Sequence, residues 1–64
     1  MQDFQQRVID ERAALDEKRV KLDEFMAGEM FSKLPQEERM RMARQLDAMN
    51  AYSAVLGERI AAFT

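Results

Sequence analysis

The side chains best suited to bind a ligand are Tyr52 and several arginines. These arginines lie near Tyr52 when the two halves of the chain are aligned side by side. Guanidinium groups bind phosphate oxygens, and a tyrosine ring stacks on a nucleobase. Amide, hydroxyl and carboxyl groups at the same level of the fold can read a base edge. The predicted ligand-binding residues are Tyr52, Arg59, Arg7, Arg12, Asn50, Ser53 and Glu11. The alternative is that these charges are solubilising flanks that form ion pairs with a second chain.

Catalytic chemistry has few candidates in this sequence. The chain has neither histidine nor cysteine, so no imidazole base, thiol nucleophile or zinc-finger ligand set can form. Ser53 has no histidine to activate it, and neighbouring carboxylates such as Glu37 and Glu38 diverge on a helix. We therefore expect no enzyme, no metal site and no cofactor.

Two stripes of residues alternate three and four apart, as on one face of a helix. The first consists of Met1, Phe4, Val8, Glu11, Leu15, Lys18, Leu22 and Phe25, and the second of Arg39, Met42, Leu46, Met49, Ser53, Leu56, Ile60 and Phe63. Between them, Gly28 is placed to end the first helix in a left-handed conformation, and Pro35 fits the first position of the next. The prediction is an all-α, antiparallel two-helix hairpin with helices over about 3–27 and 35–63. Asp3 is the expected N-cap, and Met30, Phe31 and Leu34 are expected to plug the turn.

An antiparallel alignment in which facing residue numbers add to about 64 brings the apolar layers of the two stripes together. It pairs Phe4 with Ile60, and it places Glu11 opposite Ser53 and Lys18 opposite Leu46. At the edges of the seam, one side brings Arg7 close to Arg59, and the other brings Arg12 and Arg19 close to Asn50 and Gly57. Because a buried unpaired charge is costly, each polar group in the seam needs a partner or a route to solvent.

A second apolar set lies away from this seam, and one hairpin cannot bury it. It predicts contact with another copy in a helical bundle, so we expect a homo-oligomer, at least a dimer. The predicted interface residues are Ile9, Ala13, Val20, Ala48 and Val55. Gly57 costs roughly 1 kcal/mol in mid-helix relative to alanine, which indicates a close approach there, by a packed helix or by a ligand.

The composition fits one small domain over residues 1–64. At 7.5 kDa the chain buries only about 60% of the surface that its unfolded form exposes, so its core is marginal. The formal net charge of −2 argues against a general DNA-binding protein. With no run of 18 apolar residues and no secretory signal, we expect a cytoplasmic protein without membrane contact.

Several segments resemble a family of small proteins found in tailed phages and first labelled from a crAss-like phage. They are residues 3–11, 15–18, 34–35 with 37–38, and 45–49, together with Tyr52 and residues 56–60. The resemblance implies an accessory protein acting in the bacterial cytoplasm during infection. In size and architecture the chain is also similar to oligomeric phage sponges that sequester the cyclic nucleotides of CBASS and Thoeris immunity.

These features lead to two functional expectations. The first is a non-enzymatic oligomer that sequesters a host immune-signalling nucleotide, most simply a cyclic one, and so blocks anti-phage defence. The second is a protein–protein interaction module that docks on a host or phage protein and inhibits or scaffolds it.

Overall fold

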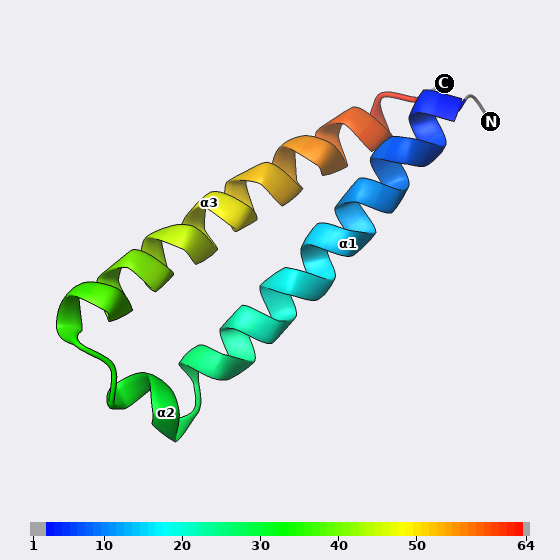
Figure 1. The fold of residues 1–64 in the computed structure, drawn as a ribbon. Coiled ribbons are helices and arrows are strands. Elements are labelled where there is room, and N and C mark those ends of the chain that lie inside the picture. The colour runs from blue at the N-terminus through cyan, green and yellow to red at the C-terminus, as the bar shows by residue number, and fades with distance from the viewer. Residues whose placement is uncertain (1–2, 64) are drawn as a thin grey trace.

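The computed structural model describes residues 3–63, which form two long antiparallel helices joined at one end by a single helical turn (Figure 1). Helix α1 spans Asp3–Met26, α2 spans Glu29–Ser32 and α3 spans Gln36–Ala61. The all-α hairpin is thus confirmed, with boundaries within two residues of those expected. The molecule is a rod with principal extents of 46 × 15 × 13 Å, and the first residues of α1 and the last residues of α3 lie together at its open end.

The turn differs from the prediction in its backbone. Gly28 has φ −91° and ψ 172°, so it is extended, and no described residue has a positive φ. The predicted left-handed cap is therefore wrong: Gly28 precedes a further turn of helix, α2, which the irregular pattern of residues 29–34 did not predict. Ser32 Oγ donates to the carbonyl of Glu29 at 2.7 Å, and the Phe31 ring packs edge-on against Phe25 with centroids 6.5 Å apart.

The predicted helix starts and the predicted plug also need adjustment. Asp3 is already helical, and Pro35 is the N-cap of α3 rather than its first residue, with its carbonyl accepting from Arg39 N at 3.0 Å. Phe31 and Leu34 are half-buried at the closed end as expected, but Met30 points to solvent.

On α3 the predicted seam is confirmed, because all eight residues of its stripe are buried or half-buried. On α1 the stripe is wrong at every second position. Glu11 and Lys18 are exposed, whereas Arg12 and Arg19 are half-buried in the seam. Met1 lies outside the described residues.

Heptad spacing explains the error on α1. The apolar residues Val8, Leu15 and Leu22 are seven apart, so a stripe through 11, 18 and 25 and one through 12, 19 and 26 fit them equally well.

The register of the two helices is offset from the predicted one by about a turn. At the open end the ring of Phe4 packs edge-on against Phe63, with centroids 5.9 Å apart, whereas the prediction paired Phe4 with Ile60. At mid-length Ser53 meets Asp16 rather than Glu11. The observed register lets the polar groups of the seam bond to one another, whereas the predicted one placed Lys18 opposite the apolar Leu46.

The apolar core is thin. Among the described residues the buried apolar side chains are Val8 and Leu56, and large apolar side chains such as Val20 and Val55 stay exposed. No helix among residues 3–63 is both long and apolar enough to cross a membrane.

The seam also contains a buried hydrogen-bond donor without a partner, which should lower the stability of the fold. Arg39 Nε is buried and has no hydrogen-bond partner. We expect Arg39→Met to raise the free energy of unfolding by about 1–3 kcal/mol, because it removes an unpaired buried donor and keeps the apolar stem. Urea unfolding followed by circular dichroism measures the change.

Arg41→Met is the matched control, because Arg41 is exposed and the substitution removes only its surface ion pair with Glu38, which should lower the free energy of unfolding by less than about 1 kcal/mol. A loss of stability in Arg39→Met comparable to a core truncation would contradict the assignment of Arg39 as a net cost.

Candidate functional site

A hydrogen-bonded polar cluster occupies the middle of the seam and is centred on Ser53, whose side chain is buried. Ser53 Oγ donates to Asp16 Oδ1 at 2.7 Å and accepts from Arg19 Nη1 at 3.2 Å and Arg12 Nε at 3.4 Å. The hydroxyl thus uses its donor and both of its acceptor sites within the fold. Ser53 is a structural link between α1 and α3, with no hydrogen-bonding capacity left for a ligand.

The charged members of this polar cluster neutralise one another in part. Arg19 Nη1 lies 2.7 Å from Asp16 Oδ1, and Arg12 Nε lies 3.8 Å from Asp16 Oδ2. Arg19 Nε also donates to Asn50 Oδ1 at 2.8 Å, so the edge contact between Arg19 and Asn50 is confirmed. One carboxylate and one amide therefore hold two guanidinium groups in fixed positions.

The same contacts perturb the titration of Asp16. The hydrogen bond from Ser53, followed by that from Arg19 and the positive charges of Arg19 and Arg12, holds the pKa of the Asp16 carboxyl below its ordinary value of 3.8. Since the charged form is favoured in the fold, ionised Asp16 stabilises the hairpin.

Gly57 provides the space for Arg12. A Cβ added at Gly57 would lie 2.9 Å from Arg12 Nη2 and 3.0 Å from Arg12 Cζ, so the guanidinium rests directly on the backbone of α3. The close approach predicted at this glycine is confirmed, and the neighbour is a side chain of α1.

A shallow open groove of about 310 Å³ lies beside the polar cluster. Its lining combines acidic, amide, cationic and apolar side chains, namely Asp16, Arg19, Val20, Asp23, Leu46 and Asn50. The groove contains two carboxylates, Asp16 and Asp23, and its one guanidinium, that of Arg19, is already bonded to Asp16. It therefore does not attract a phosphate.

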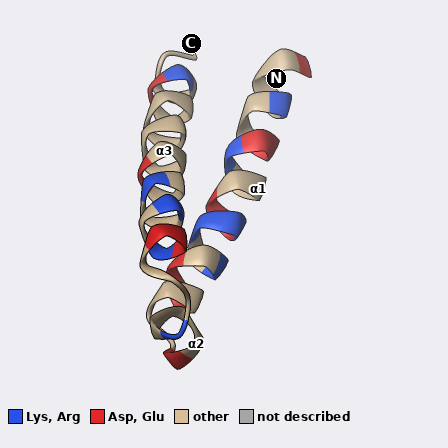
Figure 2. Cartoon of the chain, turned by 60° about the vertical axis from the view of Figure 1, so that its left-hand side comes forward, with Lys and Arg blue, Asp and Glu red and all other residues tan. Residues whose placement is uncertain are grey.

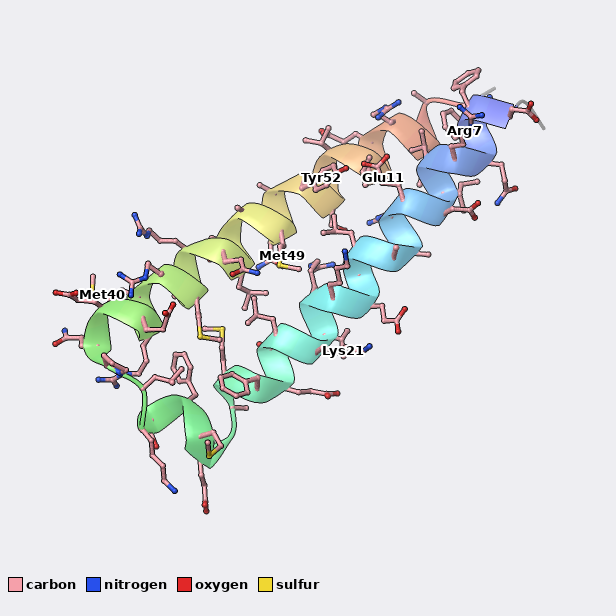
Figure 3. All side chains as sticks on the ribbon, in the orientation of Figure 1. Arg7, Glu11, Lys21, Met40, Met49 and Tyr52 are labelled. Carbon is pink, nitrogen blue, oxygen red and sulfur yellow. The ribbon has the colours of Figure 1, made fainter. Side chains whose placement is uncertain are left out.

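The predicted ligand-binding residues fall into two groups. Arg12, Asn50 and Ser53 belong to the polar cluster of the seam. The others lie elsewhere: Glu11 and Tyr52 each directly precede a member of this cluster, which turns them about 100° around their helices, away from Asn50 and Gly57. Figure 3 shows Arg7, Glu11 and Tyr52 along the half of the hairpin nearer the termini.

We call the surface formed by Arg7, Glu11, Tyr52 and Arg59 the tyrosine face. All four residues are exposed, and Tyr52 retains 45% of its accessible surface. Within residues 3–63, neither Arg7 nor Arg59 forms an ion pair. The tyrosine face therefore offers two uncommitted guanidinium groups and an open ring.

The predicted interface residues are also divided between surfaces. Ile9 is half-buried and Ala13 and Val20 are exposed on the side of α1 that borders the groove, whereas Ala48 and Val55 are exposed on the outer side of α3. One neighbouring helix therefore cannot contact both sets of residues.

The sequence analysis did not single out Asp16. The available signal was its spacing: Arg12 and Arg19 lie four and three residues from Asp16, the separations at which helical side chains meet. No group of three or more carboxylates within residues 3–63 is arranged to hold a metal ion.

The model of the Sequestin family matches residues 2–62 of the chain. That family name denotes sequestration, which is a binding role rather than a catalytic one. No curated protein and no solved structure shows significant similarity to the chain.

Acid should weaken the hairpin through Asp16. Because its folded pKa is lowered, the stability it contributes is complete above pH 3.8 and is lost as the pH falls through the lower, folded value. Asp16→Asn should reduce stability at neutral pH and flatten this acid limb, as measured by urea unfolding from pH 2 to 7. Asp47→Asn, a change at an exposed acid, is the control. Equal acid limbs in Asp16→Asn and the unmodified chain would contradict the role of this carboxylate.

A double-mutant cycle tests the contact between Gly57 and Arg12. Gly57→Ala should gain up to about 1 kcal/mol of helix propensity, but the new methyl displaces the guanidinium and offsets part of the gain. In an Arg12→Ala background the whole gain should appear. The same gain in both backgrounds would show that the arginine does not rest on this glycine.

Proposed function

The chain belongs to the Sequestin family, and from this we propose that it is a phage-encoded, non-enzymatic protein that sequesters a host signalling nucleotide. The ligand is a cyclic nucleotide of bacterial immune signalling, bound in the bacterial cytoplasm during infection. Sequestration lowers the free concentration of the signal, and it needs affinity and abundance rather than turnover.

The tyrosine face is the observation that carries this proposal. An exposed aromatic ring offers a stacking surface to any base, and stacking of this kind contributes about 1–3 kcal/mol per base. Arg59 lies seven residues from Tyr52, two turns further along the same side of α3. Guanidinium groups at this position can contact the phosphates of a nucleotide whose base stacks on Tyr52.

The seam has a supporting role in this proposal. Arg12, Asn50 and Ser53 fix the register of the hairpin through their bonds to Asp16 and Arg19, and the register sets where Arg7 on α1 lies relative to Arg59 on α3. Glu11, exposed on the tyrosine face, is available to accept hydrogen bonds from a base edge.

Calorimetry with a panel of cyclic di- and trinucleotides and cyclic ADP-ribose isomers tests the proposal. We expect binding by at least one member. Tyr52→Ala should weaken it by about 1–3 kcal/mol, while Tyr52→Phe, which keeps the stacking surface, should change it little. Arg59→Gln should weaken binding and reduce its salt dependence, and Lys33→Gln at the closed end is the matched loss of charge. An absence of heat across the panel would exclude the function.

The exposed apolar side chains favour a second candidate, a module that docks on a host or phage protein. Val20 and Val55 retain 56% and 51% of their accessible surface. In that case nucleotides should leave the melting temperature unchanged, and affinity capture from infected cells should recover one stoichiometric partner that Val55→Asp loses.

A further inference from the structure

The outer side of α3, opposite the seam, carries a third regular stripe. Its residues are four, four, three, four, three and four positions apart, and all are exposed: Met40, Arg44, Ala48, Ala51, Val55, Glu58 and Ala62. This spacing is that of a helix face which packs against another helix. We call this set the outer stripe.

The outer stripe is complementary to itself. When two copies of α3 are aligned antiparallel so that paired residue numbers add to 102 or 103, Arg44 of one copy meets Glu58 of the other, and Glu58 meets Arg44. In the same alignment Ala48 meets Val55, Ala51 meets Ala51, and Met40 meets Ala62. Each charge faces its opposite and each larger apolar side chain faces an alanine. Neither Arg44 nor Glu58 forms an ion pair within residues 3–63.

The charge distribution along the chain sets this surface apart. Residues 48–57 contain ten consecutive uncharged positions, whereas α1 never has more than three in a row. Figure 2 shows the contrast, with α1 banded in red and blue while α3 has a long tan stretch in the half nearer its C-terminal end. A solvated helix face rarely lacks charge for nearly three turns, so this surface fits a helix partner better than water.

We propose that two copies of this chain form a two-fold dimer through the outer stripe of α3, and that this dimer completes the ligand site. The part about the ligand rests on the function proposed above, while the dimer stands on the complementarity of the stripe.

The exposed area is of the right size for such a contact. The chain exposes 4987 Å², whereas a compact protein of its mass exposes about 4,250 Å². The excess of about 700 Å² is spread over the whole elongated chain and is of the same order as the roughly 800 Å² that each partner buries in a standard interface. Alanines at three of the seven positions let the two helix axes approach at the near end of the usual range of about 8–10 Å.

The dimer brings the two tyrosine faces together. Its two-fold axis is perpendicular to the plane that contains the two paired helices. A residue that lies above this plane in one copy therefore also lies above it in the other copy. Tyr52 lies one position from Ala51, where the axis crosses, and the two Tyr52 rings therefore flank the axis on the same side. Gln45 and Arg59, each seven residues from Tyr52, extend this flank on both copies.

The resulting site is symmetric, with two rings at its centre and a guanidinium at each end. Two rings related by a two-fold axis match a ligand with two bases related in the same way. The structure thus points to a cyclic dinucleotide bound at one molecule per dimer, and to a site that a single chain contains only in half.

Sedimentation equilibrium at micromolar concentration tests the dimer. The unmodified chain should have twice its monomer mass of 7.5 kDa. Ala51→Glu should return it to the monomer mass, since it places two like charges at the axis. Ala54→Glu, the same change at an exposed alanine off the stripe, should leave the dimer intact. A monomeric unmodified chain, or a dimer that Ala51→Glu does not disrupt, would overturn the proposal.

A charge exchange tests the register. Arg44→Glu and Glu58→Arg should each weaken dimerisation at least tenfold, and the double variant should restore it. Because the chain contains no cysteine of its own, any disulfide in these variants must join the introduced residues of two copies. Ala51→Cys, at the two-fold axis, should form one on mild oxidation, and Ala54→Cys, off the stripe, should not. Failure of the double variant to recover, with no Ala51→Cys disulfide, would rule out this pairing.

The ligand step has its own readout. With cyclic di-AMP and cyclic di-GMP as probes, calorimetry should give one molecule per dimer for the unmodified chain and at least tenfold weaker binding for Ala51→Glu. If the chain forms a dimer that Ala51→Glu disrupts but binds neither nucleotide, the proposed function and the shared ligand site are excluded, while the dimer itself still stands. Equal affinity in Ala51→Glu would show that each chain binds its ligand alone, and would overturn the shared site.

Discussion

The bonds between Ser53, Asp16 and Arg19 are the constraint on which the rest of this hairpin depends. The apolar core buries Val8 and Leu56, and burial of two such side chains contributes only about 3–6 kcal/mol. Such a thin core does not by itself select one register. Sliding the helices by a turn would bring new apolar layers together, but it would separate a buried hydroxyl from its carboxylate. Buried polar groups act here as they do in coiled coils, where they specify alignment.

The polar cluster also divides the cationic residues by role. Arg12 and Arg19 are bonded to Asp16 and Ser53 and serve the fold. Arg7 and Arg59 are exposed and form no ion pair among the described residues, so they are free to meet a charged ligand. Because Arg12 and Arg19 maintain the register, they also fix the position of Arg7 on α1 relative to Arg59 on α3. This division is the physical reason why we propose a ligand site on the tyrosine face rather than in the seam.

Much of the fold was predictable because it depends on local patterns. The α3 stripe was assigned correctly at all eight positions, since it carries larger apolar side chains such as Leu46, Leu56 and Ile60, whereas the outer stripe consists mainly of alanines and charged residues. The α1 stripe was only half predictable, because Val8, Leu15 and Leu22 fit two heptad frames equally well. The choice between the frames rests on Asp16, whose partner Ser53 lies 37 residues away. A contact of that sequence separation leaves no periodic trace in either helix.

The sequence by itself determined the all-α hairpin and the place of its turn, because helical spacing and the residues around Gly28 and Pro35 act over a few positions. It also excluded imidazole and thiol chemistry through the absence of histidine and cysteine. Only the tertiary structure decided the register and which arginines are committed to the seam. The reason is that hydrogen bonding is directional and short-ranged: whether Arg12 or Glu11 faces α3 depends on where Ser53 and Gly57 lie in space, and one helix carries no information about the other's position.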